Sequence, residues 1–79
     1  MTDEQFKTLE SEVNESLEGL TDNNTILIPL NYLSNMTGLS FDVLEAQIDR
    51  ILARKGLNLC KMRDKDASGQ ITRMNYWKP

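Results

Sequence analysis

The 79-residue sequence predicts an α+β fold, a small domain in which three helices pack on a three-stranded antiparallel sheet. The expected order is helix, strand, helix, helix, strand, strand. In three segments the apolar residues recur at steps of three and four, which is the spacing of one helix face. The C-terminal third instead holds two extended segments around a polar tip, which is typical of a β-hairpin. A chain of this length has room for one core, so we expect a single domain over residues 1–79.

The first element is expected to be a helix over residues 3–20. Thr2 and Gln5 form a capping box in front of it. One face is apolar and consists of Phe6, Leu9, Val13, Leu17 and Leu20. Glutamates occupy much of the remaining surface, either as a solvated face or as a docking surface. The Thr-Asp-Asn-Asn run at 21–24 is expected to be a loop.

A short strand and a short helix should follow. Residues 25–28, Thr-Ile-Leu-Ile, are largely β-branched and are closed by Pro29, which favours a brief strand. A helix is expected over residues 30–36, because Leu30, Leu33 and Met36 line one helical stripe.

The third helix is expected over residues 41–55. Ser40 is a suitable N-cap, and Gly56 stands where a helix end favours a left-handed residue. The hairpin should span residues 57–77, with its polar tip near Gly69.

This order of elements resembles the winged helix-turn-helix family over essentially the whole chain. The most telling stretch is 28–40, followed by the third helix and its Arg54-Lys55-Gly56-Leu57 ending. The resemblance implies a steep packing of the second and third helices and a first strand that pairs with the hairpin. It also implies that the third helix enters the DNA major groove while the hairpin lies along the backbone or the minor groove.

Charge is divided unevenly along the chain. Residues 1–49 carry ten acidic residues and only Lys7 as a base, a net −9, whereas residues 50–79 carry eight basic residues and two acidic ones, a net +6. The basic part favours contact with a polyanion, and the acidic part favours a basic partner.

If the chain binds double-stranded DNA, the hairpin and the third helix supply the contacts. Lysine and arginine recur at every second residue toward the hairpin tip, which is also the pattern of ordinary solubilising charges on an edge strand. The candidate nucleic-acid contacts are Ser40, Gln47, Arg50, Arg54, Lys61, Arg63, Lys65 and Arg73. The function expected on this basis is that of a small DNA-binding regulator of transcription or replication.

The third helix also supports an alternative, in which the domain docks or inhibits a protein partner. Asp42, Glu45 and Asp49 lie on one helix face, where they would repel a phosphate backbone. The alternative interaction residues are therefore these three carboxylates and Trp77, which either closes the core over the first helix or belongs to an exposed surface. A homodimer that uses the first helix as its seam is a further possibility.

Enzyme chemistry has little support in this sequence. There is no histidine, no glycine-rich phosphate loop and no nucleophile elbow, and the single Cys60 has no partner for a disulfide or a zinc site. We therefore expect no catalytic activity, no cofactor and no metal. The acidic start lacks the features of a signal peptide and no apolar run is long enough for a membrane span, so we expect a cytoplasmic protein.

Overall fold

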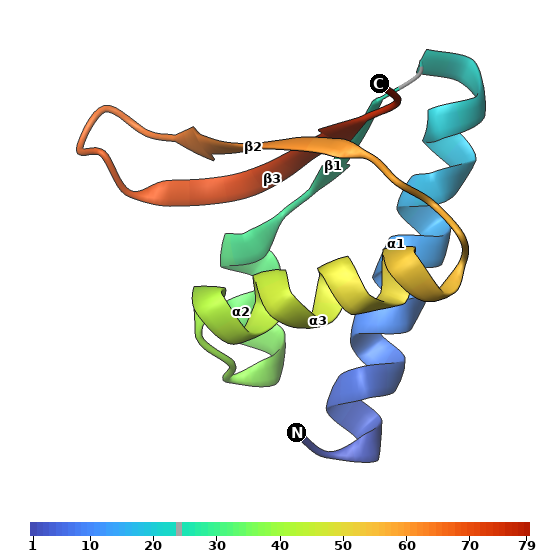
Figure 1. Ribbon diagram of the computed structural model, residues 1–79. Coiled ribbons are helices and arrows are strands. Elements are labelled where there is room, and N and C mark those ends of the chain that lie inside the picture. The colour runs from blue at the N-terminus through green and yellow to red at the C-terminus, as the bar shows by residue number, and fades with distance from the viewer. Residues whose placement is uncertain (24) are drawn as a thin grey trace.

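The computed structural model describes residues 1–23 and 25–79, without the side chains of residues 21–23. Its elements are α1 (Asp3–Asn23), β1 (Thr25–Ile28), α2 (Leu30–Thr37), α3 (Phe41–Arg54), β2 (Cys60–Lys65) and β3 (Ile71–Trp77) (Figure 1). The predicted α+β class, the order of elements and the three-stranded antiparallel sheet are confirmed. No helix in the described part of the chain has the length and apolar character to cross a membrane.

Helix α1 begins at the predicted capping box. The Thr2 backbone N–H donates to Gln5 Oε1 at 2.7 Å, and the Gln5 N–H donates to Thr2 Oγ1 at 3.1 Å. The helix continues to Asn23, so the loop predicted at 21–24 is wrong for its first three residues, and Asn24 lies outside the described residues. Thr, Asp and Asn have only moderately low helix propensities, so a run of them can complete the last turn of a helix that is stabilised along the rest of its length.

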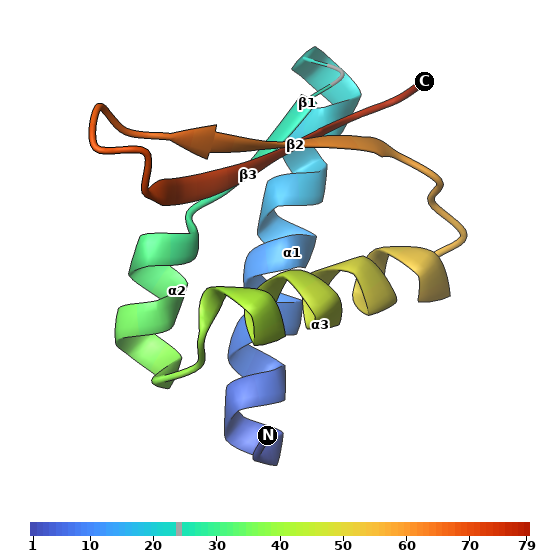
Figure 2. The same ribbon diagram turned by 60° about the vertical axis from the view of Figure 1, so that its left-hand side comes forward.

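Helices α2 and α3 are joined by a tight turn. Gly38 ends α2 with φ of 74°, the left-handed region that favours glycine, and its N–H donates to the Ser34 carbonyl at 2.8 Å. Ser40 begins α3, and its hydroxyl accepts a hydrogen bond from the Val43 N–H. This turn sets α3 across α1, as both ribbon views show (Figures 1 and 2).

The sheet has the order β1-β3-β2, so the last strand lies in the middle. Ile28 is paired with Met74 and Ile26 with Tyr76, and all four side chains are buried on the side of the sheet that faces the helices. Figures 1 and 2 show α2 and α3 on one side of the sheet, with the end of α1 beside β1. We call the side of the sheet turned away from α2 and α3 the outer face.

The core lies between the three helices and the strands β1 and β3. Its buried residues are Leu9, Val13, Leu20, Ile26, Ile28, Leu30, Leu33, Leu44, Ile48, Ile51, Leu52, Met74 and Tyr76. Strand β2 contributes none of them. The placement of Met36 on the apolar stripe of the second helix was wrong. Leu33 is the last buried residue of α2, and the Met36 side chain is exposed.

Candidate functional site

The side chains of β2 that face the helices are charged. Lys61 pairs with Tyr76 and Arg63 with Met74 across the β2–β3 ladder. Directly paired residues of an antiparallel sheet point to the same side, so Lys61 and Arg63 share the side of the buried Tyr76 and Met74. Beyond the edge of the apolar core, they meet the carboxylates of α3.

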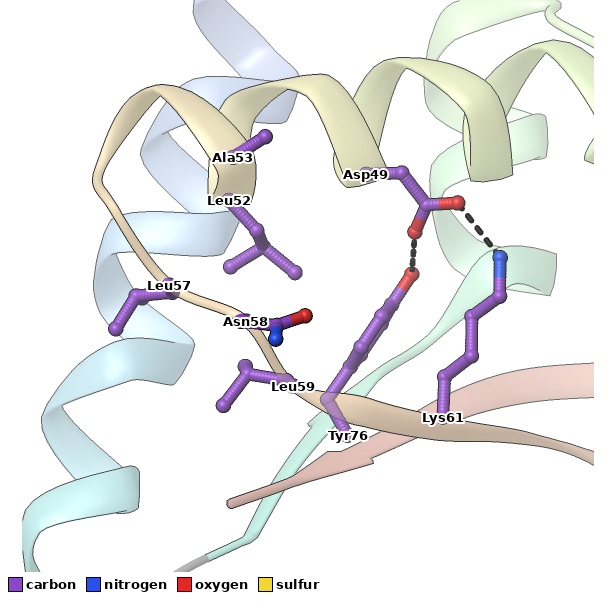
Figure 3. Close-up of a pocket in the computed structure, with 8 residues that line it drawn as sticks. All are labelled: Asp49, Leu52, Ala53, Leu57, Asn58, Leu59, Lys61 and Tyr76. Atoms are coloured by element: carbon purple, nitrogen blue, oxygen red, sulfur yellow. Dashed lines mark hydrogen bonds and ion pairs between the residues drawn. The ribbon is translucent and has the colours of Figure 1, made fainter. Parts of the chain in front are cut away.

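These groups form a compact network that we call the helix–hairpin cluster, made of Glu45, Asp49, Lys61, Arg63 and Tyr76. Lys61 Nζ lies 2.9 Å from Glu45 Oε2 and 2.6 Å from Asp49 Oδ2. Arg63 donates to both oxygens of Glu45, from Nε and Nη2, at 2.7 Å each. The Tyr76 hydroxyl donates to Asp49 Oδ1 at 2.8 Å (Figure 3). A carboxylate that accepts two hydrogen bonds from one guanidinium forms one of the stronger charge-assisted interactions in proteins.

The cluster changes the ionisation of its members. Partial burial is the largest single influence on Glu45 and opposes its charge, but hydrogen bonds and charges from Lys61 and Arg63 together outweigh it and lower its pKa. The pKa of Lys61 is raised, first by its hydrogen bond to Asp49 and then by the one to Glu45. Burial, followed by the hydrogen bond to Asp49, raises the pKa of the Tyr76 hydroxyl. At neutral pH Glu45 is therefore ionised and Lys61 is protonated.

The polar groups near the hairpin tip bind one another. The Asp66 carboxylate accepts hydrogen bonds from the Ser68 N–H at 2.9 Å and from the Gln70 N–H at 3.1 Å. The Ser68 hydroxyl and these backbone donors lower the pKa of Asp66. Arg73 Nε lies 2.7 Å from Asp64 Oδ2 on the neighbouring strand. The Arg73 side chain and the Ser68 and Gln70 N–H groups, which could hold a phosphate at a basic wing, thus already have acceptors within the hairpin.

The remaining candidate residues of α3 are distributed around the helix. Ser40 serves as the N-cap, and Gln47 is half-buried. Arg50 and Arg54 are exposed, one turn apart. Asp42 is exposed near the helix start and makes no ion pair within the described part of the chain. The helix therefore brings Glu45 and Asp49 to the hairpin and leaves Arg50 and Arg54 in solvent.

On the hairpin, Lys65 is exposed beside a register irregularity between Asp64 and Lys65. Trp77 is half-buried and follows the core residue Tyr76, so strand alternation places it on the outer face, paired with Thr25 and Cys60.

Beside the cluster lies a shallow hollow of about 250 Å³ between the end of α3 and the approach to β2 (Figure 3). Asp49, Lys61 and Tyr76 form its polar side, and Leu52, Leu57 and Leu59 form its apolar side. Pockets for small-molecule ligands usually exceed about 300 Å³. Asp49, Lys61 and Tyr76 are already hydrogen-bonded to one another. Among the described residues, no three potential ligands are close enough together to hold a metal ion.

A second concave surface lies between α1 and α2, and sequence reasoning missed it. Two hollows of about 430 and 320 Å³ share Glu4, Thr8 and Met36 and so form one groove. Tyr32 and Met36 stand on its α2 side with 53% and 55% of their surface exposed. The signal was present in the sequence as two large apolar residues four positions apart, which share one helix face.

Comparisons with protein-family models, with curated proteins and with solved structures found no match to this chain. Three helices and an open three-stranded antiparallel sheet in this order are compatible with a winged-helix layout.

Proposed function

We propose that this chain is a non-enzymatic, winged-helix type interaction module that docks a protein partner through the acidic surface of α1. One observation carries the proposal. Lys61 and Arg63, the cations expected to hold DNA, are bound by Glu45 and Asp49 of the same chain. By contrast, no ion pair joins a carboxylate of α1 to a basic side chain within the described residues.

The electrostatic argument compares the two surfaces. A phosphate that approached Lys61 or Arg63 would also approach Glu45 and Asp49, whose repulsion offsets the attraction. The outward surface of α1 exposes Glu4, Glu10, Glu15 and Glu18, with Lys7 as its one base. This surface is uncompensated, so it attracts a basic partner and speeds the encounter with it.

DNA binding is the second candidate, and Arg50 and Arg54 favour it. Both are exposed on a side of α3 that is turned away from Glu45 and Asp49, and Lys55 follows them. A contact made through these residues alone would involve few phosphates and would weaken only moderately with salt.

An NMR titration of the labelled protein distinguishes the two candidates. One series uses a lysine-rich oligopeptide, the other a random-sequence DNA duplex, each at low and then moderate salt. We expect the peptide to shift the amides of α1 and the duplex to leave residues 50–65 unchanged. If DNA causes salt-sensitive shifts at residues 50–65 and the peptide causes no shift in α1, DNA binding becomes the favoured function and protein docking the second candidate.

A further inference from the structure

The groove between α1 and α2 has one acidic wall and one apolar wall. We call it the α1–α2 groove and define it by Glu4, Thr8, Glu12, Glu15, Tyr32 and Met36. The α1 residues recur at steps of three and four along one helix side. Tyr32 and Met36 lie one turn apart on α2, on a side adjacent to that of the buried Leu30 and Leu33. Core packing therefore fixes the direction of both walls.

The two helices are fastened at one end of this groove. Gln5 Nε2 donates to the Thr37 carbonyl at 2.7 Å and links the start of α1 to the end of α2. The capping box holds the same Gln5 side chain through its amide oxygen. The groove is thus preformed, which reduces the entropy lost when a ligand binds.

The charge on the α1 wall selects the kind of ligand. Glu4, Glu12 and Glu15 line the groove, and Lys7 is the one basic residue that lines it. Partial burial, followed by the charge of the neighbouring Glu15, raises the pKa of Glu12, and an approaching cation would favour its ionised form. The half-exposed tyrosine ring and methionine side chain suit a large apolar group and adapt to its shape.

We propose that the α1–α2 groove binds a basic segment of a partner protein, which inserts one large apolar side chain between Tyr32 and Met36 while its lysines or arginines contact Glu12 and Glu15. This inference rests on the proposed function and adds the location of the site and the chemistry of the ligand. A neutral or acidic apolar segment would meet the same apolar wall but would gain nothing from the carboxylates.

The test starts from a library of random twelve-residue peptides displayed on phage and selected on the intact protein. We expect the selected peptides to carry several lysines or arginines around one large apolar residue. Their binding should weaken about tenfold or more in the Tyr32→Ala, Met36→Ala double variant and in the Glu12→Lys, Glu15→Lys double variant. Methyl-labelled methionine should show a shift of Met36 and no shift of Met62.

Matched controls are available on the same chain. Met62 is 54% exposed on the outer face, so Met62→Ala removes a comparable surface methionine and should leave binding unchanged. Glu10 and Glu18 lie on α1 but do not line the groove, so Glu10→Lys with Glu18→Lys applies the same charge change elsewhere. Circular dichroism of each variant shows whether the fold is retained.

The outcomes separate this inference from the proposed function. If basic peptides bind more weakly to the Glu10 and Glu18 variant but equally well to the Tyr32 and Met36 variant, the groove is not the binding site. Docking on the acidic surface of α1 would then still hold. A selection that returns no basic peptides would overturn both. Concentration-dependent dimerisation that is abolished by the Tyr32 and Met36 substitutions would show that a second copy occupies the groove, and it too would overturn the inference.

Discussion

Two glycines in helical surroundings have different backbone conformations. Gly19 lies inside α1, whereas Gly38 ends α2 with φ of 74°. A Cβ atom added at either position would meet no atom within 4 Å. Any difference between substitutions at the two sites therefore comes from the backbone and not from a clash.

We expect Gly19→Ala to stabilise the protein by roughly 0.5–1 kcal/mol, because alanine loses less backbone entropy in a helix. Gly38→Ala should destabilise it by about 1–2 kcal/mol, the cost of a left-handed conformation for a residue with a Cβ. Urea denaturation measures both changes. Equal effects of the same sign would contradict the helix end assigned at Gly38.

Ser40 was a candidate DNA contact, and its position in the fold gives it a structural role. Its hydroxyl accepts from the Val43 N–H at 3.4 Å and so caps α3. Ser40→Ala should cost about 1 kcal/mol of stability in the absence of any ligand. Ser11→Ala, at an exposed position within α1, provides the control and should not destabilise. An unchanged urea midpoint for Ser40→Ala would show that the cap contributes nothing.

Among the elements, the helices were the easiest to predict. Their caps and apolar steps are local signals, and the third helix ends one residue before its predicted end. Local signals did not predict which side of β2 is turned toward the helices. The apolar residues of β2 are Cys60 and Met62, so hydrophobicity alone would predict that their side of the strand faces the core. In the structure Lys61 and Arg63 face the helices instead. The register of pairing with β3 determines which side chains of β2 face the helices, and no pattern within β2 indicates that register.

The link between α3 and β2 predicts a specific dependence on pH. The ordinary pKa of Glu45 is 4.5, and in the folded protein it is lower. The stability that ionised Glu45 contributes is thus fully present above pH 4.5 and is lost as the pH falls through the lowered pKa. Glu45→Gln should cost about 1 kcal/mol at pH 7, since the pairs are partly exposed, and almost nothing well below the lowered pKa.

Urea midpoints of the wild type and Glu45→Gln, measured at pH 7 and in acid, check this expectation. Glu10→Gln is the control, because Glu10 is exposed and makes no ion pair within the described residues. A difference between wild type and Glu45→Gln that stays constant with pH would rule out the ion pairs as its source.

For the whole molecule, the division of charge along the sequence is partly cancelled by folding. The acidic residues Glu45 and Asp49 belong to the negative part, and Lys61 and Arg63 belong to the positive part. The helix–hairpin cluster brings them together. The sequence predicted two opposed patches because composition gives the charge of a segment but not its neighbours in space. The acidic surface that remains is that of α1.

The small size of the molecule makes its stability sensitive to single core residues. A chain of this length typically has about 4–12 kcal/mol of stability. Ile48 is fully buried on α3, and Ile48→Ala should cost about 2–5 kcal/mol, a large share of that total. Val43 on the same helix is 39% exposed, and Val43→Ala should change stability by no more than about 0.5 kcal/mol. Thermal unfolding followed by circular dichroism compares the two variants, and similar melting temperatures would contradict the core as described.

The central position of β3 has a consequence for how the protein is made. β3 is the last of the three strands to leave the ribosome, yet Ile26 and Ile28 of β1 and the whole of β2 pair with it. Until β3 emerges, β1 lacks its hydrogen-bonding partner and the core lacks Met74 and Tyr76. Contacts so distant along the chain form slowly, because a long loop must close first. The helices can therefore form during translation, but the sheet is completed only after Trp77 has been added, and a chain cut before Ile71 would be left with two unpaired strands.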